Sequence, residues 1–203
     1  AFTALQYENV RRMIRRDRHH ACVLFWSCGN ETLEEEPLAA ETNRSLIRLA
    51  RSLDPSRLCV HVSFRWKDHP NFEADDVICV NNYPSMWAWK LRRGCPPDAD
   101  LRESAEKWRK ALTKLRQQYP DKPILVTEFG YCSIAGTYGH SLGEDLHERV
   151  IRAEFPVLAA PLVCGASCWC WADHMWPPAR VLDGMGISPF GLNRRDRTPK
   201  KPL

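Results

Sequence analysis

Short apolar runs alternate with longer amphipathic stretches along the chain. Five runs have the length and apolar content of buried strands, and they lie at residues 22–27, 58–62, 77–80, 123–127 and 164–171. Apolar side chains spaced three and four residues apart predict helices around them, at residues 5–18, 41–53, 101–118 and 144–155. Strands that alternate with helices favour a parallel sheet, because parallel neighbours need a crossover. The pattern therefore predicts an α/β fold, either an open doubly wound sheet or part of a closed barrel.

The length and composition fit one globular domain. With 203 residues, 44% of them hydrophobic and 27% charged, the chain can bury a sizeable core. It has no GxGxxG or GxxxxGK[ST] motif, so the phosphate-binding versions of the open sheet lose support. No apolar stretch has the length that spans a bilayer, and we expect no membrane partner.

Cationic residues concentrate in the first predicted helix. Five arginines lie between residues 11 and 18, although the net charge of the whole chain is only +4. The cluster fits a nucleic-acid patch or the solvated face of an amphipathic helix whose apolar side holds Val10, Met13 and Ile14. We favour the helix face, because acidic residues are spread through the rest of the chain and no basic stripe with interleaved aromatic residues follows. No nucleic-acid partner is therefore expected.

The nine cysteines are interpreted as free thiols, most of them buried. Their number is odd, and no CxxC pair has a zinc-like partner spacing. Several lie inside apolar runs, where cysteine acts as a small hydrophobic residue. We therefore expect no metal or other cofactor, and a reducing compartment such as the cytoplasm is slightly favoured.

Polar side chains gather at the carboxyl ends of the predicted strands. Glu31 follows the first strand, Tyr83 the third and Glu128 the fourth, while Trp169 lies in the fifth. In α/β barrels the catalytic groups occupy this end of the strands. A carboxylate at the end of an apolar strand is costly unless it is used or paired, and a pair of carboxyl groups is what glycoside hydrolysis requires. The alternative interpretation is that both glutamates are strand-end caps or ion-pair partners.

Two other polar features are interpreted as structural. The run Glu34-Glu35-Glu36 is expected to be a solvated loop that leads into a helix N-terminus, where negative charge is favoured. His61 lies in the second predicted strand and is expected to be an ordinary packed or half-exposed side chain.

Several motifs together resemble glycoside hydrolase family 2, which includes β-galactosidases, β-glucuronidases and β-mannosidases. Residues 26–31 (WSCGNE) resemble its acid/base motif, and residues 124–130 (ILVTEFG) are similar to its nucleophile strand. Residues 80–84 (VNNYP), 168–173 (CWCWAD) and 195–200 (RDRTPK) resemble its sixth strand, its eighth strand and its closing segment. The motifs occur in the family's order and cover essentially the whole chain.

The resemblance implies a (β/α)₈ TIM barrel of which this chain holds only strands four to eight. Residues 1–203 would then form a partial catalytic barrel domain, without the family's N-terminal β-sandwich domains. A barrel cannot close without its first three strands. The resemblance therefore also implies a further chain or segment that supplies strands one to three.

The same resemblance implies a retaining, exo-acting β-glycosidase that hydrolyses a β-glycosidic bond by double displacement. Glu128 would be the nucleophile and Glu31 the general acid/base. The implied substrate is a carbohydrate. Its contacts would come from Asn30 for the sugar 2-hydroxyl, Tyr83 beside the nucleophile, Trp169 stacked on the ring, and Asn82, Asp173 and Trp87 around them.

Two departures from the family pattern leave alternatives open. In β-glucuronidases an Asn-x-Lys pair before the closing segment recognises the sugar carboxylate, whereas the matching stretch here, residues 186–191 (GISPFG), has no lysine. A glucuronide is therefore less expected, and a neutral sugar is as good an expectation. The missing strands leave open a second function, that of a catalytically inactive truncated barrel that acts as a binding or assembly subunit.

Overall fold

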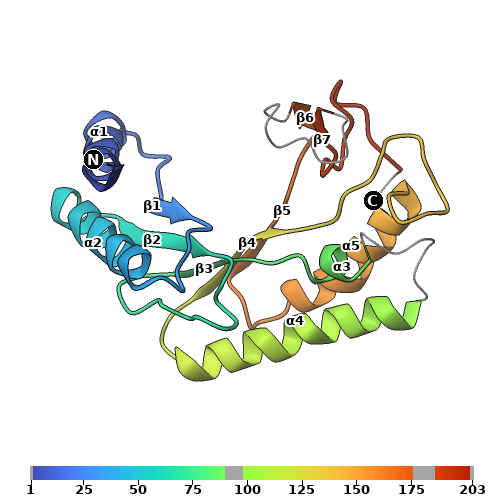
Figure 1. Ribbon diagram of the computed structural model, residues 1–203, viewed down its shortest axis with the longest axis horizontal. Coiled ribbons are helices and arrows are strands. Elements are labelled where there is room, and N and C mark those ends of the chain that lie inside the picture. The colour runs from blue at the N-terminus through green and yellow to red at the C-terminus, as the bar shows by residue number, and fades with distance from the viewer. Residues whose placement is uncertain (1, 90–97, 176–185, 202–203) are drawn as a thin grey trace. The chain divides into compact units, whose positions relative to one another are not determined.

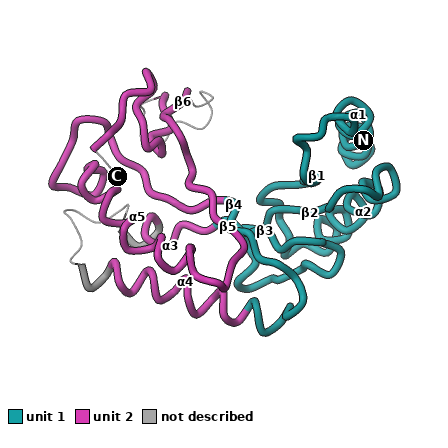
Figure 2. The backbone as a smooth tube through the Cα atoms, turned by 180° about the vertical axis from the view of Figure 1, so that it is seen from behind, with its two compact units in different colours: residues 1–81, 115–127 teal, residues 82–114, 128–203 magenta. Residues whose placement is uncertain are grey.

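The computed structural model describes residues 2–89, 98–175 and 186–201 (Figure 1). The chain divides into two compact units (Figure 2). Unit 1 comprises Ala1–Asn81 and Leu115–Thr127, and unit 2 comprises Asn82–Lys114 and Glu128–Leu203. Helix α4 (Asp98–Gln118) and strand β4 (Ile124–Phe129) each belong partly to both units.

Unit 1 holds the amino-terminal helices and most of the parallel strands. Its complete elements are α1 (Phe2–Asp17), β1 (Phe25–Asn30), α2 (Pro37–Leu53), β2 (Leu58–Ser63) and β3 (Ile78–Asn81). β1 pairs with β2 and β2 with β3, both in parallel. The amide of Ile78 donates to the carbonyl of Pro123 at 2.9 Å, so the start of β4 lies beside β3. The sheet thus runs in the order β1-β2-β3-β4-β5, with β4 shared by the two units.

The core of unit 1 is formed by one face of each amino-terminal helix and the first strands. Buried side chains come from α1 (Val10 and Ile14), from α2 (Leu46 and Ile47) and from β1 (Trp26). The expected split of α1 into an apolar and a cationic face is confirmed, because its arginines are exposed or half-buried. Each fully buried side chain of this size contributes roughly 1.5–3 kcal/mol.

Unit 2 contains shorter strands around two long helices. Its elements are α3 (Pro84–Trp89), most of α4, the end of β4, α5 (Glu144–Leu158), β5 (Gly165–Cys168), β6 (His174–Met175) and β7 (Ile187–Ser188). The amide of Trp169 donates to the carbonyl of Phe129 at 2.8 Å, which joins β5 to the end of β4. The core gathers Tyr83, Tyr131 and Leu146, among others.

A buried carboxyl group ties α5 to α4 inside unit 2. Glu154 is fully buried and accepts hydrogen bonds from the Ser104 hydroxyl at 2.8 Å and from the Trp108 indole at 3.0 Å. The Ser85 hydroxyl is a third donor. Burial raises the pKa of Glu154, although these donors oppose the shift. The three donors satisfy a polar group that would otherwise be costly in a core.

The predicted alternation of strands and helices is confirmed, with strand ends that differ by up to three residues from the predicted ones. β1 begins at Phe25 rather than residue 22, because the amide of Val23 donates to the His20 carbonyl in a turn. β5 ends at Cys168 because the amide of Cys170 donates instead to the Phe190 carbonyl at 3.0 Å. The sequence did not predict α3 or the β6–β7 pair, which are too short to show a period. Among the described helices, none is both long and apolar enough to cross a membrane.

Candidate active site

In unit 1, Glu31 directly follows β1 and has an unusual backbone conformation. Its φ is 51°, in the left-handed region, and its amide donates to the Val62 carbonyl at 2.9 Å. The register of β1 against β2 shifts just before it, between Ser27 and Asn30. A left-handed conformation costs a residue with a Cβ roughly 1–3 kcal/mol, and it persists where surrounding contacts hold it. The contacts around Glu31 therefore define its position within unit 1.

Asn81, the last residue of β3, binds the Glu31 carboxyl group. Its side-chain amide nitrogen donates to Glu31 Oε1 at 2.8 Å and to Asn30 Oδ1 at 3.2 Å. The Thr127 hydroxyl donates to Asn81 Oδ1 at 2.7 Å, which fixes the orientation of the amide. Asn81 is fully buried. It thus holds both the predicted acid/base and the predicted ligand of the 2-hydroxyl.

Sequence reasoning missed Asn81 although it noticed the polar strand end. Of the neighbours Asn81 and Asn82, only Asn82 was selected as a candidate. Adjacent residues on a strand point to opposite faces, and the sequence alone does not show which of the two faces Glu31. In the structure Asn82 is also buried, and its backbone amide donates to the Glu128 carbonyl at 3.1 Å.

In unit 2, Glu128 lies near the end of β4 and binds Tyr83. The Tyr83 hydroxyl donates to Glu128 Oε2 at 2.5 Å. Tyr83 is itself buried, and its ring meets that of Phe190 edge-on at 5.8 Å. A hydroxyl donor held in one place favours negative charge on the carboxylate it faces. The arrangement suits a carboxylate that must remain ionised.

Trp169, which directly follows β5, presents an accessible aromatic surface. Its side chain is 36% exposed and meets the His174 ring edge-on at 5.8 Å. An indole fixed at its edge and open on part of its surface can stack on the apolar face of a sugar. The side chain of Trp87 lies outside the described part of the chain, although its backbone belongs to α3.

Gly130 permits the close approach of β4 to the Trp169 segment. Its φ is 151°, and a Cβ at this position would lie 2.6 Å from the Trp169 carbonyl oxygen. We expect Gly130→Ala to displace that backbone and to lower the free energy of unfolding by about 2–4 kcal/mol. Chemical denaturation followed by tryptophan fluorescence measures the change.

A matched control for this substitution is Gly136→Ala. Gly136 also has a positive φ, of 79°, but a Cβ there meets nothing within 4 Å. Its loss should be smaller, about 1 kcal/mol. Equal losses for the two variants would contradict a special role for the contact between Gly130 and Trp169.

Asp173 anchors the closing segment of the chain. Its carboxylate accepts hydrogen bonds from the Gly191 amide at 2.8 Å and from Lys200 Nζ at 2.9 Å. Lys200 also donates to the Ser133 carbonyl at 2.6 Å. Asp173 therefore orients the segment that follows residue 186, and it also lines a cavity.

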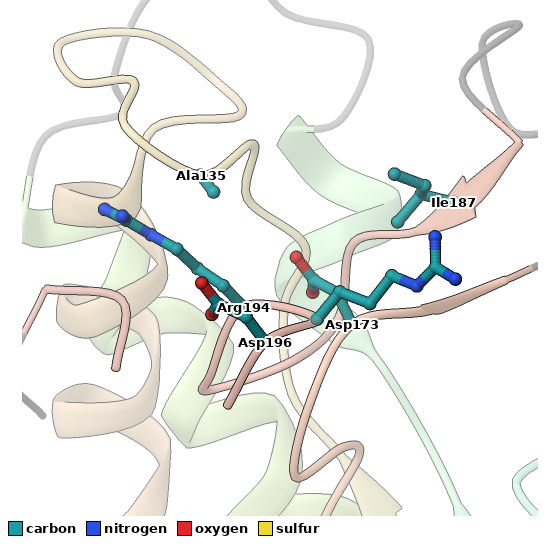
Figure 3. Close-up of a pocket in the computed structure, with 6 residues that line it drawn as sticks. Ala135, Asp173, Ile187, Arg194 and Asp196 are labelled. Carbon is teal, nitrogen blue, oxygen red and sulfur yellow. The ribbon is translucent and has the colours of Figure 1, made fainter. Parts of the chain in front are cut away.

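That cavity, in unit 2, has a volume of about 300 Å³ and a mixed charged lining (Figure 3). Arg194 lines it and lies 3.9 Å from Glu144 as a long ion pair. The full lining is Ala135, Asp173, Ile187, Arg194, Arg195 and Asp196. Ile187 belongs to residues 186–191, and the buried Ser188 and Phe190 of that stretch add no charge.

Two structural expectations from the sequence need correction. Glu34 was expected to be solvated, but it is only 4% exposed, because it accepts a hydrogen bond from Ser63 and lies 3.8 Å from His61. His61 is not an ordinary packed side chain, since it faces two carboxyl groups. The eight described cysteines form no disulfide with one another, and of these eight only Cys59, Cys79 and Cys132 are buried, so most are not buried as expected. Within the described ranges, no group of three acidic, histidine or cysteine side chains could hold a metal ion.

The chain is similar to one protein family and to several β-glucuronidases. The family described as "Glycosyl hydrolases family 2, TIM barrel domain" matches residues 2–155. A β-glucuronidase of Streptococcus agalactiae is 26% identical over 98% of this chain and 33% of its own length. One from Paenibacillus borealis is 30% identical over 97% and 32%. A solved β-D-glucuronidase structure from Dictyoglomus thermophilum is 27% identical and superposes with a TM-score of 0.84 over 98% of this chain and 33% of its own. The chain thus spans about a third of the length of these relatives.

Proposed function

The chain belongs to the family 2 glycosyl hydrolases, and we propose on that basis that it carries the catalytic carboxyl groups of a retaining, exo-acting β-glycosidase. The observation that carries the proposal is the contact between Tyr83 and Glu128, a hydroxyl donor held 2.5 Å from a carboxylate at a strand end. The contact between Asn81 and Glu31 supports the second role. Relatives named β-glucuronidase support hydrolysis of a glycosidic bond.

In the proposed reaction, the ionised carboxylate of Glu128 attacks the anomeric carbon of the sugar. The bond from that carbon to the leaving oxygen breaks, and Glu31 gives its proton to this oxygen. Glu31 then takes a proton from water, whose oxygen attacks the anomeric carbon and releases Glu128. This double displacement requires the two carboxyl groups to be about 5–5.5 Å apart in the working enzyme.

Asn30 and Trp169 are the proposed contacts of the sugar itself. Asn30 would bind the 2-hydroxyl, a contact that strengthens in the transition state, and Asn81 would orient it through the 3.2 Å hydrogen bond. Trp169 would stack on the ring through its exposed surface. Asn82 and Asp173 would line the sugar site, Asn82 through its backbone hydrogen bond and Asp173 through the segment that it orients. Trp87 is proposed to contact the leaving group.

We further propose that residues 1–203 are strands four to eight of the barrel, as a partial catalytic domain. The chain's parallel strands follow one another in the order of a barrel sheet, and the chain covers about a third of each relative. β1 and β5 stand at the two ends of that order. Unpaired parallel edges favour addition of strands, so a further segment or chain would supply strands one to three.

We propose that a neutral sugar is at least as good a substrate as a glucuronide. The relatives are named for glucuronides, but residues 186–191 contribute no cation here. A panel of nitrophenyl β-glycosides tests this, with the neutral galactoside and glucoside expected to react at least as fast as the glucuronide. A clear preference for the glucuronide would contradict the proposal. Arg194 and Arg195, which line the cavity beside Asp173, would then be the candidates for binding the sugar carboxylate.

The second candidate function is a binding or assembly subunit without catalysis. The same panel separates the two. The purified chain is assayed alone and after co-expression with a segment that supplies strands one to three, in each case beside Glu128→Gln. If the wild-type chain hydrolyses a glycoside and Glu128→Gln does not, the chain is a catalytic one. If both hydrolyse it only at the background rate, with and without the added segment, the chain is a non-catalytic subunit.

Asn81→Ala is expected to lower kcat by about 10–100-fold in whichever of these preparations hydrolyses the glycosides. The substitution removes a hydrogen bond to a carboxyl group, which is typically about 1.5–3 kcal/mol. Thr127→Val, which frees the Asn81 amide to rotate, should have a smaller effect in the same direction. An Asn81→Ala variant with unchanged kcat would contradict the role given to Asn81.

A further inference from the structure

A cluster of buried polar side chains lies next to the loop that carries Glu31. His61, on β2, is 1% exposed, and its Nδ1 lies 2.9 Å from Oδ1 of Asp75. Its Nε2 lies 3.8 Å from Oε1 of Glu34. The Ser63 hydroxyl donates to the other oxygen of Glu34. One imidazole is thus held between two carboxyl groups, all within unit 1.

The neighbours of His61 favour its protonated form. Burial by itself lowers the pKa of His61, but the carboxylates of Asp75 and Glu34 outweigh this effect and raise it to about 9. Lys122, before β4, is a further charged group beside the cluster, and its Nζ donates to the Asp75 carbonyl at 2.5 Å. On the remaining side the ring of Phe72, stacked at 5.3 Å, adds no charge.

The two atoms that face each other across the cluster have no hydrogen-bond partner within the described residues. They are Nε2 of His61 and Oε1 of Glu34. Buried polar atoms without a hydrogen-bond partner are costly. Attraction between an imidazolium and a carboxylate at 3.8 Å offsets that cost in a water-poor interior. The arrangement is therefore favourable while His61 carries its proton and unfavourable once it does not.

Glu34 connects this cluster to the backbone of Glu31. The left-handed Glu31 is followed by a tight loop in which the Glu34 amide donates to the Thr32 carbonyl at 3.0 Å. Asn43 on α2 donates to the Thr32 hydroxyl at 2.8 Å. The Glu34 side chain thus anchors this loop on β2 through Ser63 and His61, in addition to the bond from the Glu31 amide to Val62.

We propose that Glu34, His61 and Asp75 form a device that positions Glu31, in which the charged imidazole fixes the loop through Glu34. His61 is a positioning residue, because it acts on the reaction only through this loop. The inference rests on the proposed function, in which Glu31 is the acid/base. Its consequence is that the geometry of Glu31 is present at neutral pH and is lost as His61 deprotonates.

The sign of the pH effect follows from the raised pKa. Stabilisation by the imidazolium is fully present below the pKa of an unfolded histidine, about 6.5. It is lost as the pH rises through the folded value of about 9. The loop of Glu31 should therefore loosen on the alkaline side, between these two values.

A pH titration of the wild-type chain by NMR tests the device without any substitution. The imidazole signals of His61 should titrate near pH 9, and the backbone amide signals of residues 31–34 should move with the same midpoint. A His61 that titrates near its ordinary pKa would overturn the proposal, as would loop signals that ignore its titration.

Glu34→Gln tests the same device through the reaction. Glutamine can still accept the hydrogen bond from Ser63 but no longer faces His61 with a charge. We expect the His61 midpoint and the alkaline limb of kcat to fall together by about one pH unit, with KM changed less than about twofold. Glu36→Gln, the same change at an exposed position two residues on, should move neither. An alkaline limb that stays in place while the His61 midpoint moves would overturn the proposal.

These outcomes separate the device from the proposed function. If Glu31→Gln keeps full hydrolysis, the acid/base assignment fails. The NMR titration needs no turnover, so it still decides whether His61 controls the loop. Coupled titration together with an active Glu31→Gln variant would retain the device and reject the proposed role of Glu31.

Discussion

Glu128→Gln is expected to lower kcat on nitrophenyl β-glycosides by about 10⁴-fold or more. The amide is close to the carboxylate in size but is not a nucleophile, so no covalent glycosyl intermediate can form. Loss of a covalent nucleophile has effects of this order in enzymes where it has been isolated. Steady-state kinetics in the hydrolysing preparation measure the change, and KM should move far less than kcat.

Two further variants serve as comparisons, one with a smaller expected loss of kcat and one with none. Tyr83→Phe keeps the ring against Phe190 but removes the donor to Glu128, and it should cost about 10–100-fold in kcat. Glu148→Gln, the same change at a residue that forms an ion pair with the exposed Arg152 at 2.8 Å, should leave kcat unchanged. A Glu128→Gln variant that loses no more than Glu148→Gln would contradict the assignment of the nucleophile.

Glu31→Ala is expected to lower kcat by about 10²–10⁴-fold, the usual range for general acid–base catalysis. The loss should depend on the leaving group, which distinguishes it from the loss at Glu128. A nitrophenolate leaves without a proton, so the first step survives and the glycosyl intermediate accumulates for want of a base to activate water. An alkyl leaving group needs the proton, so its release should be slowed more strongly.

Rapid-mixing kinetics check this second expectation. Glu31→Ala should give a burst of nitrophenol followed by slow turnover, and added azide should restore the second step because it needs no base. Glu35→Ala, four residues along in the same loop region and paired with Arg65 at 3.4 Å, should retain wild-type kinetics. A loss that is the same for good and poor leaving groups, without a burst, would contradict the acid/base role.

The sequence predicted the strand ends better than the side chains around them. Glu31 and Glu128 follow apolar runs that are unmistakable as strands, and the structure has both residues at those ends. The sequence did not identify Asn81 as a site residue, because its role depends on the face of β3 to which it points. That face is set by pairing with β2 and β4, which a single sequence does not contain.

The errors at Glu34 and His61 have a common physical cause. A run of three glutamates is most often solvated, and a lone histidine in a strand is most often packed, so each residue taken alone favours a structural interpretation. They become a charged cluster only because the loop after β1 folds back onto β2, 27 residues further along the chain at His61. Contacts between distant segments of this kind leave no local pattern in the sequence.

The short elements were missed for a different reason. α3 has six residues, and β6 and β7 have two each. Hydrophobic periodicity needs more residues than this to be visible. The elements instead depend on tertiary contacts, such as the hydrogen bond from the Gly191 amide to Asp173 that holds the segment after β7.

Trapping of the glycosyl intermediate tests the central assignment most directly. A 2-deoxy-2-fluoro glycoside with a good leaving group slows the second step, and intact mass spectrometry followed by peptide mapping locates the attached sugar. We predict one sugar per chain, on the peptide that contains Glu128, and none on Glu128→Gln. Labelling of Glu31 or of another residue, or steady hydrolysis of ordinary substrates without any trapped sugar, would contradict the assignment.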